Sequence, residues 1–259
     1  MKAMIFAAGL GTRLKPITDT LPKALVPIGG RPLLEHVARK LKAAGIDEAV
    51  VNVHHFADMI EKWIADDAGN ENGTGLTMQM SDERAGLLET GGGILKARPY
   101  LQGCGSFLIH NVDILSNLDI NRFVSQMHED ALATLLVSDR ETSRYLLFDP
   151  QTMHLVGWTN VKTGEVKSPY PDLRPESCVK MAFSGIHVIS DKVFEVMEQY
   201  VKEKGLHEQS RNPRFPIIDF YLSVCAKYPV QAVVADDLQL IDVGKLDTLE
   251  QAELLCQGL

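Results

Sequence analysis

The chain has 259 residues, an apolar fraction of 45% and a charged fraction of 23%, values that are ordinary for a globular protein of about one domain. Its formal net charge is −8 and no stretch is rich in lysine or arginine, which argues against a nucleic-acid partner but allows a local pocket for a small anion. No apolar run reaches the roughly 18 residues of a membrane span, and four widely separated cysteines without a C-x-x-C pair favour reduced thiols in the cytoplasm.

Strands and helices are expected to alternate over the first 140 residues. Hydrophobic spacing predicts strands at 2–8, 47–55, 75–81, 106–113 and 132–138, and helices at 31–45, 57–68, 90–101 and 120–130. Repeated alternation of strand and helix indicates a parallel sheet with helices on both faces.

The pattern changes near residue 140. Antiparallel strands are expected at 145–149, 154–158 and 179–190, with a loop at 167–177, then helices at 191–203 and 216–227, apolar runs at 229–235 and 238–244, and a closing helix at 245–256. We find no internal repeat, low-complexity tract or linker. The simplest prediction is one domain over residues 1–259, with a substrate-binding half at 141–259 following the first half, 1–140.

The most informative segment is FAAGLGTRLKPITDTLPKALVPIGGRP, residues 6–32. Gly9 and Gly11 follow the first strand, where an open α/β sheet places its ligand crevice, and glycines let backbone N–H groups approach phosphate oxygens. A P-loop would need lysine after the second glycine, where this chain has Thr12. A dinucleotide fingerprint would need a third glycine where it has Leu14. Both motifs are therefore excluded.

Two basic residues stand ten positions apart in this loop. Arg13 supplies a planar fork of donors suited to phosphate, and Lys23 supplies a compact charge. Either residue alone could be an incidental charge on a solvated loop. Their combination with the two glycines, directly after the first strand, favours a phosphate site.

The pattern G-x-G-T-R-L-x-P-x-T, followed by L-P-K and P-x-x-x-x-P, resembles the signature of the sugar nucleotidyltransferases, and the likeness extends over nearly the whole chain. This family makes nucleotide sugars on a Rossmann-like, mostly parallel sheet flanked by helices. The resemblance implies that residues 1–140 bind the nucleotide and 141–259 bind the sugar phosphate. It implies that Arg13 stabilises charge at the reacting phosphate and Lys23 contacts phosphate groups. The glycine loop would hold the triphosphate through Ala8, Gly9, Gly11 and Thr12.

A second glycine-rich segment, residues 89–93, opens the helix expected at 90–101. The glycines there could allow close approach of a ligand to a helix N-terminus, or could form a tight loop with positive φ angles. The sequence L-E-T-G-G-G resembles uridylyltransferases and some guanylyltransferases of the family that act on N-acetylmuramate and mannose 1-phosphates. That likeness implies base or ribose contacts from Glu89, Thr90 and Gly91, joined by Asn111.

Two aspartates end predicted strands. Asp113 follows the apolar run 106–112 and Asp242 follows LQLI, positions that point into the crevice of a parallel sheet unless they merely cap a turn or helix. Magnesium prefers a few carboxylates together with substrate phosphates and water. The resemblance implies that both aspartates bind Mg²⁺. Val112 and Lys245 replace a glycine and a threonine of the family pattern, and the valine is expected to narrow the space beside the ribose.

The sugar side is marked by Phe183-Ser184-Gly185-Ile186, which resembles a family segment beside the sugar and implies hydroxyl contacts from Ser184 and Gly185. Glu165, in the sequence E-V-K, could hold a sugar hydroxyl or lie in an exposed hairpin. Asp219, at a helix start, could reach the pocket or cap the helix. The pair at 54–55, His-His, has no third ligand nearby and reads as strand-end structure.

The resemblance implies a cytoplasmic, Mg²⁺-dependent enzyme that joins a nucleoside triphosphate to a sugar 1-phosphate and releases pyrophosphate, with UTP slightly preferred over GTP. Because the attacking phosphate is already an anion, no general base is expected. Two alternatives stay open: a non-catalytic regulator that binds a nucleotide sugar, and a cytidylyltransferase or molybdopterin-type transferase with another acceptor. The identity of the sugar, the oligomeric state and the pathway are left undetermined.

Overall fold

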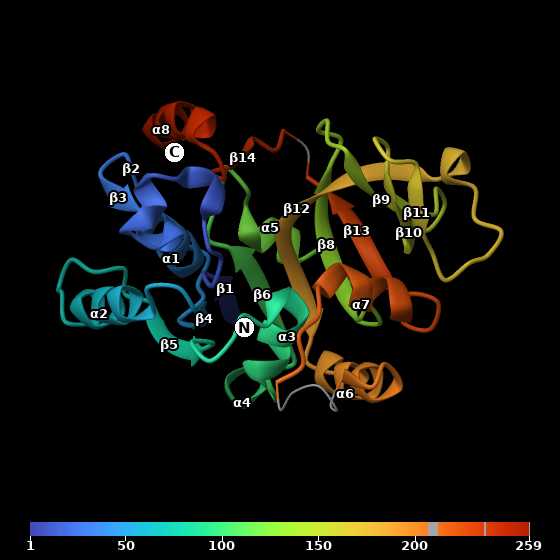
Figure 1. Cartoon of the computed structure of the whole chain (residues 1–259), viewed down its shortest axis with the longest axis horizontal. Helices are drawn as coiled ribbons and strands as arrows, with labels where there is room; N and C mark the ends of the chain where they lie inside the picture. Colours follow the sequence, from blue (N-terminus) through green and yellow to red (C-terminus); the bar gives the residue numbers. More distant parts are fainter. Residues whose placement is uncertain (207–211, 236, 259) are drawn as a thin grey trace.

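A ten-stranded mixed sheet runs through the computed structural model of the chain, which describes residues 1–206, 212–235 and 237–258 (Figure 1). The strand order is β11 (Glu165–Lys167), β10 (Leu155–Asn160), β9 (Arg144–Phe148), β12 (Val179–Ser190), β6 (Ser106–Asn111), β1 (Lys2–Phe6), β4 (Glu48–Val53), β5 (Thr77–Asp82). A branch is added by β8 (Ala133–Ser138), which pairs with β12, and by β13 (Val230–Val234), which pairs with β8.

Strand direction divides the sheet as the sequence predicted, with one correction. Strands β6, β1, β4 and β5 are parallel, and β9, β10, β11 and β12 are antiparallel. The strand expected at 132–138 does not extend the parallel group, because β12 returns antiparallel between β6 and β8. Residues on β12 therefore pair with both halves of the chain.

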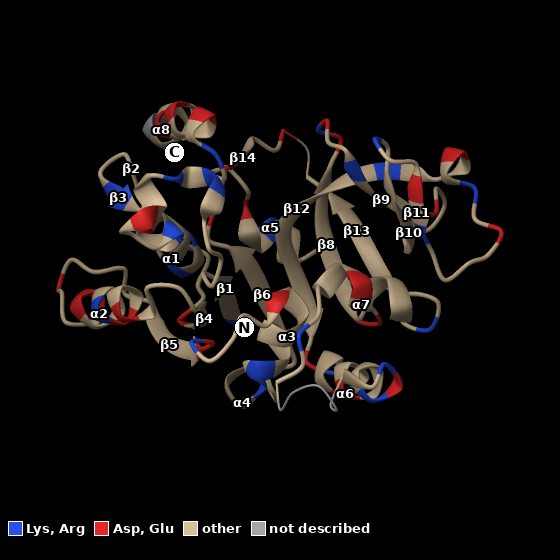
Figure 2. Cartoon of the chain, in the orientation of Figure 1, with Lys and Arg blue, Asp and Glu red and all other residues tan. Residues whose placement is uncertain are grey.

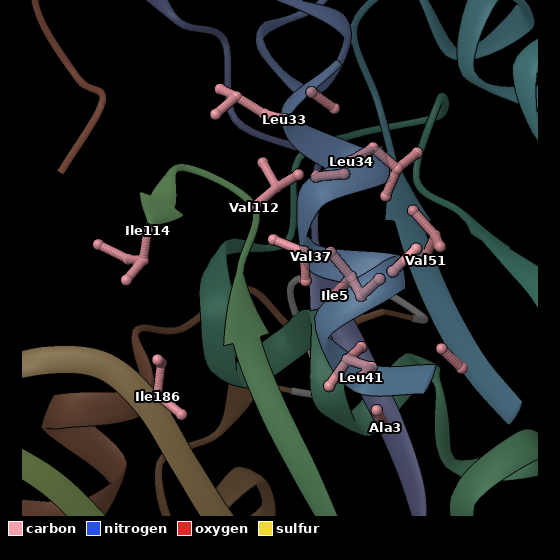
Figure 3. Close-up of a cluster of buried hydrophobic side chains, with 14 of the residues drawn as sticks. Ala3, Ile5, Leu33, Leu34, Val37, Leu41, Val51, Val112, Ile114 and Ile186 are labelled. Carbon is pink, nitrogen blue, oxygen red and sulfur yellow. The ribbon is translucent and has the colours of Figure 1, made fainter. Parts of the chain in front are cut away.

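Successive side chains of a strand point to opposite faces of the sheet, and both faces of the parallel strands are apolar. Two hydrophobic cores therefore form, one on each face. Ala3 and Ile5 point to one face, where Val37 and Leu41 of α1 lie beside them (Figure 3). Met4 points to the other face. The first face is covered by α1 (Leu33–Ala43), α2 (Ala57–Ala68), α5 (Ile120–Val124) and α8 (Leu249–Gly258), and the second by α3 (Glu89–Lys96), α4 (Arg98–Leu101), α6 (Val193–Glu203) and α7 (Ile217–Val224).

Several element boundaries differ from the sequence prediction for identifiable reasons. The helix expected at 90–101 is two helices, α3 and α4, since Pro99 cannot continue the hydrogen-bonding ladder. The helix expected at 120–130 ends at Val124, because few residues beyond it are apolar enough to join the core. The closing helix begins at Leu249, after a short 3₁₀ turn at Leu246–Thr248.

Three short strands were not predicted. Strands β2 (Pro27–Ile28) and β3 (Arg31–Pro32) form a small hairpin, and β7 (Ile114–Ser116) pairs antiparallel with β14 (Leu240–Asp242). Two or three residues are too few to show a period in the sequence. The β7–β14 pair has a direct consequence, because it brings the segments that carry Asp113 and Asp242 side by side.

Candidate functional site

Three cavities that share lining residues extend from the ends of the parallel strands to the antiparallel strands β9 and β10. The glycine-loop cavity, about 570 Å³, is lined by residues 6–13 together with Lys23, Asn52, Glu83, Glu89, Thr90, Asn111 and Asp113. The basic cavity, about 690 Å³, shares Arg13 and Gly244 with it. The β9 cavity, about 410 Å³, shares Arg140, Thr142 and Arg144 with the basic cavity. Together they can accommodate a ligand larger than any one of them.

A buried network of hydrogen bonds holds the start of the glycine loop against β4 and the segment after β5. Asn52 accepts a hydrogen bond from the backbone N–H of Ala7 (2.8 Å) and donates one to Glu83 (2.8 Å). The second carboxylate oxygen of Glu83 accepts from the N–H of Leu88 (3.1 Å), just before Glu89. Burial raises the pKa of Glu83, which is only 1% exposed. One carboxylate thus ties the two glycine-rich segments together.

Gly11 is the loop position that needs glycine. Its φ is +64°, and an added Cβ would stand 2.9 Å from a methyl carbon of Thr18, whose hydroxyl donates to the Gly11 carbonyl (2.8 Å). Ala8, Gly9 and Thr12 line the same cavity. The loop therefore presents a backbone surface to the cavity.

Two cations and two carboxylates meet at the junction of the glycine-loop and basic cavities. Lys23, which is 8% exposed, donates from Nζ to Oδ2 of Asp113. The N–H of Val243 donates to the Asp113 carbonyl (2.8 Å), which fixes Asp242 beside it. A Cβ added at Gly244 would lie 2.6 Å from Oδ1 of Asp242 and 2.8 Å from a guanidinium nitrogen of Arg13, so both groups lie against this glycine.

The carboxylate of Asp242 has the environment of a cation ligand. Its Oδ1 is buried and accepts no hydrogen bond from the described residues. Burial, followed by the nearby charge of Asp113, raises the pKa of Asp242, while Lys23 and Arg13 oppose that effect. Two carboxylates are few donors, and no group of three or more His, Cys, Asp or Glu gathers in the described ranges. The donor set fits Mg²⁺, which takes its remaining oxygens from phosphate and water.

The second glycine-rich segment is organised by packing. Glu89 and Thr90 line the glycine-loop cavity, and Glu89 (φ +61°) accepts from Nε of Arg214 at 2.9 Å. Gly91 is not on the cavity wall. Its N–H donates to the carbonyl of Phe215 (2.9 Å), and an added Cβ would overlap the Phe215 ring. Gly91 therefore neither contacts a ligand site nor forms a tight loop with a positive φ angle, the two alternatives that the sequence offered. It is a helical residue that allows the segment around Phe215 to approach closely.

The predicted sugar-side residues are not brought together. Asp219 lines the β9 cavity, where its carboxylate accepts from Lys167 (3.3 Å). Glu165 is exposed and lies outside the three cavities. Ser184 is 1% exposed, with a hydroxyl that has no partner among the described residues. Gly185 (φ +74°) packs over Asn111, whose amide nitrogen would be 2.7 Å from an added Cβ.

Sequence reasoning missed four residues that line these cavities and lie on strands or directly after them. Asn52 lies near the end of β4 and Glu83 directly follows β5. Because ligands of open α/β sheets bind at the carboxyl ends of the strands, polar residues at these positions could have been predicted to line the site. Arg144 and Trp158 lie on β9 and β10 and face the β9 cavity. They follow no motif, and only the strand order places them near the glycine loop.

A glycine loop and convergent cations at the ends of parallel strands are typical of α/β proteins that bind phosphate-containing ligands. The chain belongs to the nucleotidyl transferase family, whose model matches residues 2–256. This confirms the family that the sequence signature indicated.

Individual relatives agree. The chain is 46% identical over 111 residues to the N-acetylmuramate alpha-1-phosphate uridylyltransferase of Caulobacter vibrioides, covering 43% of this chain and 45% of that protein. It is 44% identical over 119 residues to the enzyme of the same name from Neisseria meningitidis, covering 46% and 49%. These matches span about half the length of the two relatives.

The fold also has a close counterpart among solved structures. A putative glucose-1-phosphate thymidylyltransferase from Bacillus anthracis superposes with a TM-score of 0.75 at 20% identity, covering 100% of this chain and 96% of that one. This confirms the predicted Rossmann-like α/β architecture. None of the helices in the described ranges is long and apolar enough to cross a membrane.

Proposed function

We propose that the protein transfers a nucleoside monophosphate from a nucleoside triphosphate to a sugar 1-phosphate, forming a nucleotide sugar and pyrophosphate. The observation that carries this proposal is the convergence of Arg13, Lys23, Asp113 and Asp242 beside the glycine loop. The names of the two uridylyltransferase relatives support it.

In this reaction a phosphate oxygen of the sugar attacks the α-phosphorus in line. A new P–O bond forms as the bond to the oxygen that bridges the α- and β-phosphates breaks, and pyrophosphate leaves with that bonding pair. The step needs alignment and charge compensation more than covalent chemistry from the protein. The loop from Ala8 to Thr12 holds the triphosphate, and Arg13 and Lys23 offset the charge that shifts onto the leaving group.

Asp113 and Asp242 are the residues that we propose hold Mg²⁺. The buried, unpartnered Oδ1 of Asp242 supports this assignment. The ion would neutralise charge on the phosphates when bound. On the protein side, Lys23 holds the Asp113 carboxylate and Gly244 leaves space for Arg13 and Asp242 to approach each other.

The base is assigned to the part of the glycine-loop cavity formed by Glu89, Thr90 and Asn111, with uracil ahead of guanine. A buried polar pocket discriminates strongly, because a wrong base leaves its donors and acceptors unpaired. We assign the sugar to the β9 cavity, where Asp219 and Lys167 provide polar groups and Trp158 an apolar face. The four unpaired cysteines support a cytoplasmic location.

The test is a matrix of triphosphates and sugar 1-phosphates in which pyrophosphate release is measured. We expect one base to dominate whichever sugar is offered, and chelation of divalent cations to stop release. Tight binding of a nucleotide sugar without pyrophosphate release from any combination would instead identify a non-catalytic regulator. Equal rates with UTP, GTP, dTTP and CTP would contradict the assignment of the base pocket.

A further inference from the structure

The basic cavity concentrates positive charge in an acidic protein. Its lining includes five cationic side chains and a single carboxylate, Asp242, whereas the whole chain has a net charge of −8. The cations are Arg13, Arg140, Arg144, Lys162 and Lys245. Like charges gathered around one cavity repel each other, and a bound anion relieves that repulsion. The cavity therefore has the electrostatics of an anion site.

These cations come from two parts of the molecule. Arg13 lies on the glycine loop and Lys245 shortly after β14, beside the proposed phosphate site, whereas Arg144 and Lys162 lie on β9 and on the turn between β10 and β11 (Figures 1 and 2). The N–H of Val161 donates to the carbonyl of Ser143 (2.9 Å), which ties that turn to the start of β9. Arg144 and Lys162 therefore form a second group of positive charge, separate in sequence from the phosphate loop.

Neither of these two side chains is neutralised by the protein. Within the described residues, the side chains of Arg144 and Lys162 make no ion pair or hydrogen bond. In contrast, Lys167 on the neighbouring strand pairs with Asp219, and Lys23 pairs with Asp113. Arg144 and Lys162 are thus two cations of this region whose side chains are free to bind a ligand.

Strand pairing places Arg144 beside the surface that we assign to the sugar. Cross-strand partners share one face of a sheet, and β9 pairs Arg144 with Asn160 and Leu146 with Trp158. Arg144 lines both the β9 cavity and the basic cavity. A sugar ring at Trp158 would therefore bring one of its substituents to Arg144.

We propose, building on the function above, that the acceptor is a sugar 1-phosphate with a second anionic group, a carboxylate or a further phosphate, bound by Arg144 and Lys162. The planar guanidinium of Arg144 suits either group, because both present two oxygens to its fork of donors. The acceptor's own 1-phosphate lies with Arg13 at the reacting end, so the second group accounts for cations that the transfer step does not use.

Matched acceptors test this directly. Glucose 1-phosphate, glucuronic acid 1-phosphate and glucose 1,6-bisphosphate differ only at carbon 6. N-acetylglucosamine 1-phosphate and N-acetylmuramic acid 1-phosphate differ by a carboxylate-bearing ether. We expect kcat/KM, measured by pyrophosphate release with the best triphosphate, to be about tenfold or more higher for a charged member of at least one set. The first set separates carboxylate from phosphate. The preference should shrink as ionic strength rises.

Arg144→Gln and Lys162→Gln should each lower the ratio of charged to neutral acceptor by roughly 3- to 10-fold. The matched control is Lys180→Gln. Lys180 pairs with Leu147 on β9, on the face opposite to Arg144, and should leave the ratio unchanged. Circular dichroism and melting temperature verify that the variants, all at exposed positions, are folded.

The outcomes separate this proposal from the general function. If no charged acceptor is preferred, or if both variants lower kcat/KM equally for charged and neutral acceptors, Arg144 and Lys162 do not bind a second anionic group. The proposal is then wrong, while the transferase function stands. If no acceptor of either kind supports pyrophosphate release, the proposed transferase function itself is wrong.

Discussion

Arg13 and Asp242 both lie against Gly244, which places the Arg13 guanidinium at the junction of two cavities, beside one of the proposed metal carboxylates. Arg13→Lys keeps the charge and loses the fork that can engage two phosphate oxygens. We expect kcat to fall on the order of 10²–10³-fold and nucleotide affinity to change much less. Steady-state kinetics and nucleotide titration measure both, with Arg39→Lys on α1 as the control. Equal losses in kcat and affinity would mean that Arg13 contributes only to ground-state binding.

Asp242 shows a conflict between stability and function at a single residue. Burial disfavours its charged form and its Oδ1 has no partner in the described structure, so Asp242→Asn removes a buried charge without breaking a hydrogen bond there. We expect the variant to be at least as stable as the wild type in urea without metal, and to lose pyrophosphate release. Mg²⁺ should raise the melting temperature of the wild type only. A variant that is still stabilised by Mg²⁺ and fully active would exclude Asp242 as a ligand.

At the scale of elements, the glycines of α3 allow residues 213–215 to pack closely against this helix. Helix propensity alone predicts that Gly92→Ala stabilises the protein by about 1 kcal/mol. In the structure, however, an added Cβ would overlap the carbonyl oxygen of Pro213 and stand 3.1 Å from Leu88 Cβ. We therefore expect a net loss of about 1–3 kcal/mol in urea denaturation. Gly86→Ala is the control, because a Cβ there meets nothing within 4 Å. A stabilised Gly92→Ala variant would show that α3 and the 213–217 segment separate easily.

The sequence predicts a feature well when nearby residues determine it, and poorly when it depends on contacts with distant parts of the chain. The strand at 179–190 was predicted with the bounds that the structure has, because β-branched and apolar residues make up most of the segment and encode it locally. The packing of Gly91 could not be predicted, since its partner, Phe215, is distant in the chain. The same holds for the site. Motifs indicated the glycine loop and the two aspartates, but Arg144 and Trp158 reach the cavities only through the insertion of β12 in the strand order.

At the scale of the whole molecule, two buried histidines link stability to pH. Burial lowers the pKa of His187 to about 3 and that of His110 to about 4. Because both values lie below about 6.5, the usual value of an unfolded histidine, the unfolded chain takes up protons first as the pH falls. The stabilisation is complete above about pH 6.5 and is lost progressively between about pH 6.5 and pH 3–4.

We therefore expect the free energy of unfolding to fall between pH 7.5 and pH 5, and to fall by about 2 kcal/mol less in His187→Gln. Urea titrations at the two pH values measure this difference, which is independent of any constant effect of losing the hydrogen bond between His187 and Tyr221 (2.9 Å). His55→Gln, at an exposed position, is the control and should behave like the wild type. An unchanged pH dependence in His187→Gln would indicate that this histidine is protonated in the folded protein.

The two halves of the chain are predicted to fold as one domain because β12 pairs with strands of both. Its residues Ile186–Ser190 pair with β6 of the first half, and Val179–Met181 pair with β9 of the second. Separating the halves would expose the edge of β6 and the buried side chains on both faces of the sheet. The halves should therefore unfold together.

The two tryptophans of the chain provide one probe for each half. Trp63 lies on α2 and packs against the first core, and Trp158 lies on β10 and packs against the second. In Trp63→Phe and Trp158→Phe, the remaining tryptophan reports its own half, and we expect each fluorescence transition in urea to coincide with the circular dichroism transition of the same variant. A fluorescence midpoint displaced from the circular dichroism midpoint in either variant would show that the halves are separate folding units. Coincidence would show that the phosphate loop and the sugar-side strands are parts of one cooperative structure, in which a ligand spanning both halves stabilises the whole chain.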